Sequence, residues 1–159
     1  MEKISHRISK MAQSATVAMN QKGRDLRSQG IDIINLSAGE PDFNTPDHIK
    51  AAAKKAIDDN FTHYPPVAGY PELLEAVSNK FRRENNLDFK PEQIVVSTGA
   101  KNALANAILC LVDPGDEVII PAPYWVTYAE LVKLAEGKCV VINGSIKNDF
   151  KITPRQLEE

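Results

Sequence analysis

An alternation of strands and helices in the second half of the chain constrains the fold more than any other feature. Three short apolar stretches, 94–97, 117–121 and 138–143, have the length of buried strands. Amphipathic helical patterns lie between them, one after Gly99 and one over 124–136. Strands separated by helices at this spacing favour right-handed crossovers and a parallel sheet. The sequence therefore predicts an α/β fold.

Helix-starting and helix-ending residues define the remaining elements. We expect a helix over 15–30 that ends at a glycine, a short strand over 31–36, a helix opened by Thr45 and Pro46, and a helix from Pro71. Near the end, Thr153-Pro-Arg-Gln156 has the form of a capping box. The sequence stops six residues into that last helix, so we expect it to be a piece of a longer protein.

The segment Val95–Leu104 predicts a strand, a tight turn at Gly99 and a helix. The first N–H groups of such a helix have no partner inside it, and the positive end of the helix dipole favours an anion such as phosphate. Ser97, Thr98 and Lys101 add donors and charge nearby. By itself this pattern is also that of an ordinary strand-to-helix turn.

Two aromatic segments add to this pattern. Trp125, the only tryptophan, follows the 117–121 strand, and ligands bind at the carboxyl ends of parallel strands. Its ring could stack on a planar cofactor or simply pack in the core. The loop 63–74 is rich in proline and glycine and carries Tyr64, which is either held for a function or a surface aromatic.

Five segments in this order resemble the N-terminal part of a class I aminotransferase, a fold type I enzyme that depends on pyridoxal 5'-phosphate (PLP). They are Ile34–Phe43, Tyr64–Leu74, Ser97–Leu104, Asp113–Val118 and Pro123–Tyr128. Within the family, the chain is most similar to the bacterial aspartate/prephenate aminotransferase branch. The resemblance runs from about Ser5 to the last residue.

The resemblance implies a cofactor site. The backbone N–H groups of Gly99, Ala100 and Lys101 are expected to hold the phosphate of PLP, and Trp125 to stack on its pyridine ring. Tyr64 matches a tyrosine that reaches the cofactor of the neighbouring subunit, so the family pattern implies a homodimer.

The resemblance also implies a substrate site. Gly39 matches the residue whose N–H meets the α-carboxylate, and Thr16 and Lys101 match positions that help to bind a distal carboxylate, with Trp125 beside them. The alternative for Lys101 is a role at the phosphate alone. None of the lysines matches the Schiff-base motif, which lies beyond position 159 in the family. No catalytic residue is therefore assigned, and the chain alone is expected to be inactive.

The implied architecture is a three-layer αβα large domain with an incomplete sheet, together with part of a small domain. We expect an N-terminal arm over 1–13, the first part of the small domain over 14–45, and the first part of the PLP-binding large domain over 46–159. A sheet that stops after three strands leaves an open apolar edge.

Composition excludes other classes of function. The formal net charge of −2 does not suit nucleic-acid binding, and no apolar run approaches the length of a membrane span. The cysteines and histidines lack metal-ligand spacing. Cys110 and Cys139 lie in apolar stretches and are expected to be buried free thiols, as in a reducing cytoplasm.

The expected function is transamination between an amino acid, aspartate or another dicarboxylic one, and a 2-oxo acid. One alternative is a related PLP enzyme with a different amino donor, or a lyase on the same scaffold. A second is a non-catalytic fragment or interaction remnant. A dinucleotide-binding fold is excluded because Ser97–Asn102 lacks the G-x-G-x-x-G spacing.

Overall fold

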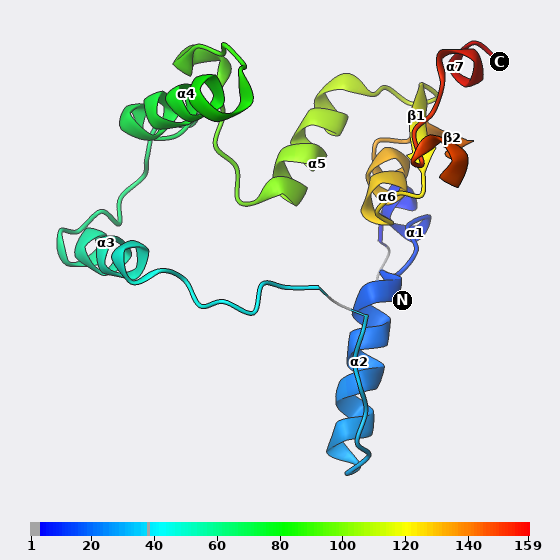
Figure 1. The fold of residues 1–159 in the computed structure, drawn as a ribbon, viewed down its shortest axis with the longest axis horizontal. Coiled ribbons are helices and arrows are strands. Elements are labelled where there is room, and N and C mark those ends of the chain that lie inside the picture. Colours follow the sequence, from blue (N-terminus) through cyan, green and yellow to red (C-terminus); the bar gives the residue numbers. More distant parts are fainter. Residues whose placement is uncertain (1–3, 38) are drawn as a thin grey trace. The chain divides into compact units, whose positions relative to one another are not determined.

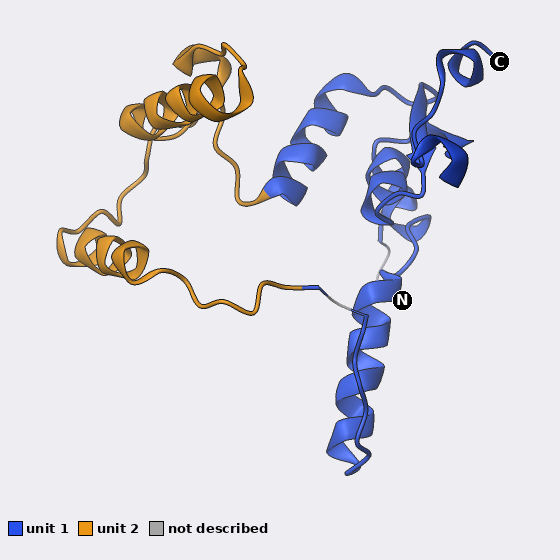
Figure 2. Cartoon of the chain, viewed as in Figure 1, with its two compact units in different colours: residues 1–39, 100–159 blue, residues 40–99 orange. Residues whose placement is uncertain are grey.

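The computed structural model describes residues 4–37 and 39–159, and the chain divides into two compact units (Figures 1 and 2). Unit 1 combines residues 1–39 with residues 100–159, and unit 2 comprises residues 40–99. Unit 1 therefore contains segments that are far apart in the sequence.

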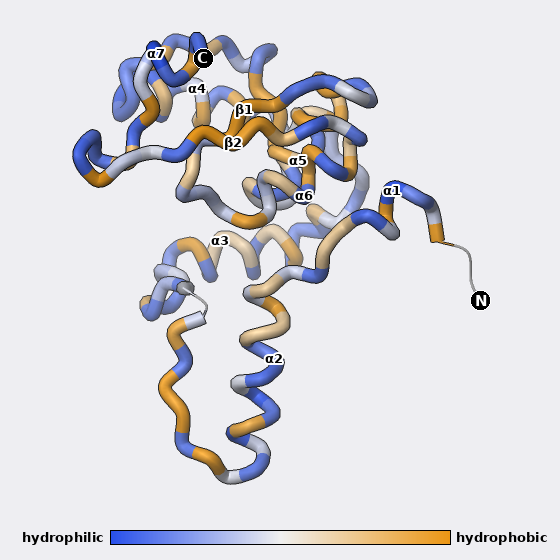
Figure 3. The backbone as a smooth tube through the Cα atoms, turned by 90° about the vertical axis from the view of Figure 1, so that its right-hand side faces the viewer, coloured by the Kyte–Doolittle hydropathy of each residue, from blue (hydrophilic) through white to orange (hydrophobic). Residues whose placement is uncertain are grey.

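A parallel pair of strands forms the sheet of unit 1. Strand β1 (Glu117–Ala122) pairs with β2 (Lys138–Asn143) in the register Glu117↔Lys138 to Ala122↔Asn143. Helix α6 (Thr127–Leu134) connects them and packs on both strands. Apolar residues run along both strands (Figure 3). The predicted α/β class and both strand positions are confirmed.

The core of unit 1 lies between this strand pair and α6. Its buried apolar side chains are Ile120, Leu131, Val132 and Ala135, and Val132 is the most enclosed at 1% exposure. Helix α5 (Ala100–Leu111) packs against α6 and begins directly after Gly99, as predicted. Burial of these apolar side chains holds α6 against the strand pair.

A polar network closes the end of β2. Helix α7 (Pro154–Glu158) begins with the predicted capping box: Thr153 Oγ1 accepts from the Gln156 N–H, and Gln156 Oε1 accepts from the Thr153 N–H at 3.1 Å. The amide nitrogen of Gln156 also donates to the Asn143 carbonyl at 3.0 Å. The 3₁₀ helix η2 (Ile146–Asn148) lies between the strand and α7.

The N-terminal part of unit 1 consists of two helices and an extended segment. Helix α1 (His6–Ser9) lies in the predicted arm and contacts α6. Helix α2 (Ala15–Ser28) is capped by Ser14, and Gly30 follows it with a φ of +79°. Residues 31–37 then run back along α2 (Figure 1), where Ser37 Oγ donates to Asn20 at 2.8 Å.

Unit 2 contains helix α3 (Asp47–Asp58), helix α4 (Pro71–Asn85) and the 3₁₀ helix η1 (Pro91–Gln93). Pro71 is the first residue of α4, as its fixed φ predicts. The buried Ser78 hydroxyl donates to the Phe89 carbonyl and ties α4 to the segment before η1. Ile94 follows η1 and is 9% exposed.

Several predictions need correction. In the described parts of the chain, residues 31–36 and 94–97 form no strand, because extended backbone is a strand only when a neighbour completes its hydrogen-bond ladder. The helix predicted over 124–136 is shorter, since α6 starts at Thr127. Both cysteines are free thiols, but Cys110 is exposed and Cys139 only half-buried. The division into arm, small domain and large domain stays a prediction.

Candidate functional site

The turn before α5 is built as the sequence predicts. Gly99 has a φ of +83°, a conformation that side chains with a Cβ rarely adopt, and its N–H donates to the Ser97 carbonyl at 2.8 Å. No heavy atom lies within 4 Å of the place where a Cβ would be. Helix α5 then begins at Ala100, and its first four N–H groups have no partner inside the helix. The turn and the helix start therefore suit an anion.

Lys101 and Trp125 meet at the carboxyl end of β1. Lys101 is the second residue of α5, and Trp125 lies in the loop that joins β1 to α6. The Lys101 Nζ is 4.9 Å from the centroid of the indole ring, close enough for a cation–π contact. Tyr128 meets the same ring edge-on, with the centroids 5.7 Å apart at 86°. Trp125 remains 42% exposed, so its ring is held in place but accessible.

A cavity of about 490 Å³ lies beside this pair within unit 1. Residues 11–15 line one part of it, and Lys101 with four residues of the loop and α6 (Val126, Thr127, Glu130 and Leu131) line the rest. Thr16 is half-buried in the first turn of α2, directly after the lining segment. Gly39 is exposed and has open space around it. The cavity therefore brings a lysine of α5 and the start of α2 to one place.

Within unit 2, the loop that carries Tyr64 is fixed to the segment that leads to Gly99. The Val96 N–H donates to the Ala68 carbonyl at 2.8 Å. Gly69, with a φ of +121°, lies so close to Val96 that an added Cβ would be 3.0 Å from a methyl group. Tyr64 itself is fully exposed.

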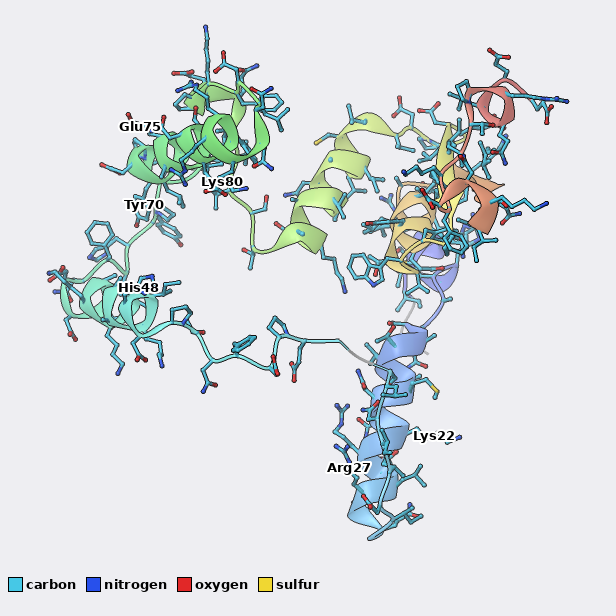
Figure 4. The ribbon with its side chains drawn as sticks, viewed as in Figure 1. Lys22, Arg27, His48, Tyr70, Glu75 and Lys80 are labelled. Atoms are coloured by element: carbon cyan, nitrogen blue, oxygen red, sulfur yellow. The ribbon has the colours of Figure 1, made fainter. Side chains whose placement is uncertain are left out.

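Tyr70 packs inside unit 2. It lies at the start of α4 (Figure 4), and its ring contacts that of Phe61 with the centroids 5.4 Å apart. This contact supports a packing role for Tyr70, in contrast to the exposed Tyr64. Lys101, Ala100, Trp125, Thr16 and Gly39 belong to unit 1, whereas Gly99 and Tyr64 belong to unit 2.

Glu130 is a charged cavity residue that sequence patterns did not single out. Its Oε1 accepts from the Lys133 Nζ at 2.7 Å, and its Oε2 accepts from the Ala12 N–H at 2.9 Å. The hydrogen bond from Lys133, and then the one from Ala12, lower the pKa of the Glu130 carboxyl below its ordinary value. The same pair raises the pKa of Lys133. Both groups are therefore charged at neutral pH.

Comparison with known proteins identifies the family of this chain. The profile of the family "Aminotransferase class I and II" matches residues 31–159. The chain belongs to the class I and II aminotransferase family. The first turn of α5 and the loop that carries Trp125 both lie inside the matched region.

Relatives and solved structures agree with this assignment. Over 155 residues the chain is 50% identical to the aspartate/prephenate aminotransferase of Cereibacter sphaeroides, covering 98% of this chain and 39% of the relative. It is 48% identical to the aspartate aminotransferase of Geobacillus stearothermophilus, covering 99% of this chain and 40% of the relative. The aspartate aminotransferase of Thermus thermophilus with maleate superposes with a TM-score of 0.94 at 47% identity, covering 99% of this chain and 41% of that one.

The chain spans about 40% of the length of the curated relatives it matches. Its fold is that of the corresponding part of a fold type I aminotransferase. Among residues 4–37 and 39–159, no helix is long and apolar enough to cross a membrane. The same residues contain no cluster of three or more potential metal ligands.

Proposed function

We propose that this chain is part of a PLP-dependent aminotransferase that moves an amino group between an amino acid and a 2-oxo acid. The observation that carries this proposal is the Lys101 Nζ held 4.9 Å from the exposed Trp125 ring, at the N-terminal end of α5. A helix N-terminus and an ammonium group suit a phosphate, and an accessible indole suits a planar ring. The residues present therefore fit PLP.

In this proposal, the N–H groups of Gly99, Ala100 and Lys101 bind the cofactor phosphate. Trp125 covers one face of the pyridine ring, fixes its plane and excludes water from that face. The edge-on contact with Tyr128 holds the indole in position. When bound, PLP supplies an aromatic ring that takes up electrons as a proton leaves the substrate.

Substrate binding is assigned to the other predicted residues. Gly39 offers a backbone N–H without a side chain in the way, which suits close approach by an α-carboxylate. Thr16 and Lys101 are proposed to bind a distal carboxylate, and Trp125 forms the wall beside them. Two observations support a dicarboxylic substrate: Lys101 lines the cavity that Thr16 adjoins, and the similar Thermus thermophilus protein was solved with maleate, which is a dicarboxylate.

We further propose that the whole protein acts as a homodimer in the cytoplasm. Tyr64 is fully exposed on a loop that Gly69 and Val96 fix in place, which suits a side chain that reaches a neighbouring subunit. Neither site would then be complete in one protomer. This chain alone is expected to be inactive, because none of its lysines matches the Schiff-base motif.

A related enzyme with another amino donor is the second candidate. The alanine aminotransferase of Pyrococcus furiosus has a TM-score of 0.90 with this chain at 31% identity. The same fold therefore serves an amino acid without a distal carboxylate. Lower identity makes this candidate weaker than the dicarboxylic one.

The full-length protein provides the test. We expect addition of PLP to produce an absorbance band between about 300 and 450 nm, and aspartate with 2-oxoglutarate to give oxaloacetate and glutamate. Preference for alanine over aspartate would favour the second candidate. Absence of both PLP binding and transamination would refute the proposal.

A further inference from the structure

One contact in unit 1 joins segments that are 118 positions apart in the sequence. The Ala12 N–H donates to Glu130 Oε2 at 2.9 Å, and α1, which precedes Ala12 in the sequence, also contacts α6. The Glu130 side chain is only 20% exposed. A hydrogen bond to an ionised acceptor is roughly twice as strong as one between neutral groups.

The two oxygens of Glu130 have different partners. Oε2 accepts from Ala12, whereas Oε1 accepts from Lys133, one turn further along α6. The negative charge of Glu130 is therefore balanced by Lys133. This balance matters because Glu130 and Lys101 line the same cavity. An unbalanced carboxylate there would repel an anionic ligand that Lys101 attracts.

The bond to Ala12 also fixes the start of α2. Residues 11–15 form part of the cavity wall. Ser14 Oγ accepts from the Val17 N–H at 3.4 Å and caps the helix in which Thr16 follows. If the bond at Ala12 were lost, this segment would no longer be held on α6, and both the cavity wall and Thr16 could move.

We propose that Glu130 is a positioning residue, which docks residues 4–15 on α6 and thereby shapes the cavity in which Lys101 meets the distal carboxylate of the substrate. Lys133 serves this arrangement by cancelling the charge of Glu130. The substrate part of this inference rests on the function proposed above, whereas the docking part does not.

Limited digestion of the full-length protein with trypsin tests the docking. Lys10 is exposed and directly precedes the docked Met11–Ala12 segment. Trypsin must bind the residues on both sides of the bond that it cuts, so cleavage after Lys10 reports release of this segment. We expect Glu130→Ala to speed this cleavage by roughly tenfold, since a bond to a charged group is lost and digestion follows the open population. Glu130→Gln retains an acceptor oxygen for Ala12, and Lys133→Met leaves the Ala12 bond intact, so both should remain near the wild-type rate.

A second variant removes the donor of the Ala12–Glu130 hydrogen bond instead of its acceptor. Ala12→Pro removes the donor N–H and leaves Glu130 and Lys133 in place. It should also speed cleavage after Lys10, while the thermal unfolding midpoint of the protein stays close to that of the wild type. Wild-type cleavage rates in both Glu130→Ala and Ala12→Pro would overturn the docking.

Substrate kinetics test whether Glu130 shapes the cavity for a distal carboxylate. We expect Glu130→Ala to raise the KM for aspartate several-fold more than the KM for alanine. Lys133→Met should do the same without faster digestion, because it leaves the Glu130 carboxylate unbalanced in the cavity. Glu130→Gln should not, because it keeps an acceptor for the Ala12 N–H and adds no negative charge. An unchanged ratio of the two KM values in Glu130→Ala would overturn the cavity role. If the wild-type protein shows no transamination activity, only the proposed function is refuted. The docking is tested by digestion, which does not depend on activity.

Discussion

Replacement of Lys101 by methionine tests the substrate assignment most directly. The change removes the ammonium group and keeps a flexible side chain of similar length. Lys101 has two roles in the proposed site: its Nζ lies 4.9 Å from the Trp125 centroid, and it lines the cavity in which a distal carboxylate would bind. The two roles differ in the free energy that they contribute and in the substrates that they affect.

The contact with the ring concerns every substrate. A cation–π pair at an exposed site contributes about 0.5–1 kcal/mol, so losing its hold on the indole should lower kcat/KM by at most roughly two- to fivefold, and equally for any amino acid. The contact with a distal carboxylate concerns only dicarboxylic substrates. A hydrogen bond to a charged group contributes about 1.5–3 kcal/mol, and because Lys101 is exposed we expect the lower end, near tenfold.

The assay is kcat/KM of the full-length enzyme for aspartate and for alanine. Lys147→Met, which changes the net charge equally in an exposed residue of η2, is the matched control. We expect Lys101→Met to lower the aspartate-to-alanine ratio about tenfold and Lys147→Met to leave it unchanged. Equal losses for both substrates, with weaker PLP binding, would refute the carboxylate role and leave a phosphate role.

Three further predictions concern other parts of the chain. Tyr64→Phe should weaken PLP retention while the dimer persists by size-exclusion chromatography; unchanged retention would contradict a role across the interface. Gly69→Ala should lower the free energy of unfolding in urea by about 1–3 kcal/mol, since φ is +121° and a methyl group of Val96 lies 3.0 Å from the new Cβ. Gly30→Ala, at a positive φ but in open space, should cost less, and an equal cost would rule out crowding by Val96. The folded-state pKa of Glu130 lies below its ordinary 4.5, so its contribution to stability is complete above that pH and is lost as the pH falls through the lowered value. The difference in unfolding free energy between wild type and Glu130→Ala should therefore shrink below pH 4.5, and a constant difference down to pH 3 would contradict this.

Local signals in the sequence predicted the starts of three helices correctly. Pro71 begins α4, Gly99 precedes α5, and the capping box at Thr153 begins α7. Each of these signals acts within a few residues, through a fixed φ, a permitted positive φ or a side chain that bonds to its own backbone. They therefore determine where a helix begins independently of contacts with distant parts of the chain.

Pairing and long-range contacts could not be predicted in the same way. The apolar stretch 31–36 is extended, but Ile34 and Leu36 are about nine-tenths exposed at 89% and 91%, and no neighbouring strand completes a ladder within the described residues. An apolar run predicts that a segment can be a strand, not which segment will pair with it. The bond between Ala12 and Glu130 likewise has no local signature, because its partners are 118 positions apart.

The amide at position 156 illustrates how a common motif becomes specific. In a capping box, glutamate and glutamine serve equally well, since only a side-chain oxygen is required. Here the nitrogen of the same amide donates to the Asn143 carbonyl at 3.0 Å, which a carboxylate cannot do. Glutamate at this position would keep the helix cap but set a negative charge against a carbonyl oxygen at the end of β2. One atom of a side chain thus makes two otherwise interchangeable residues distinct.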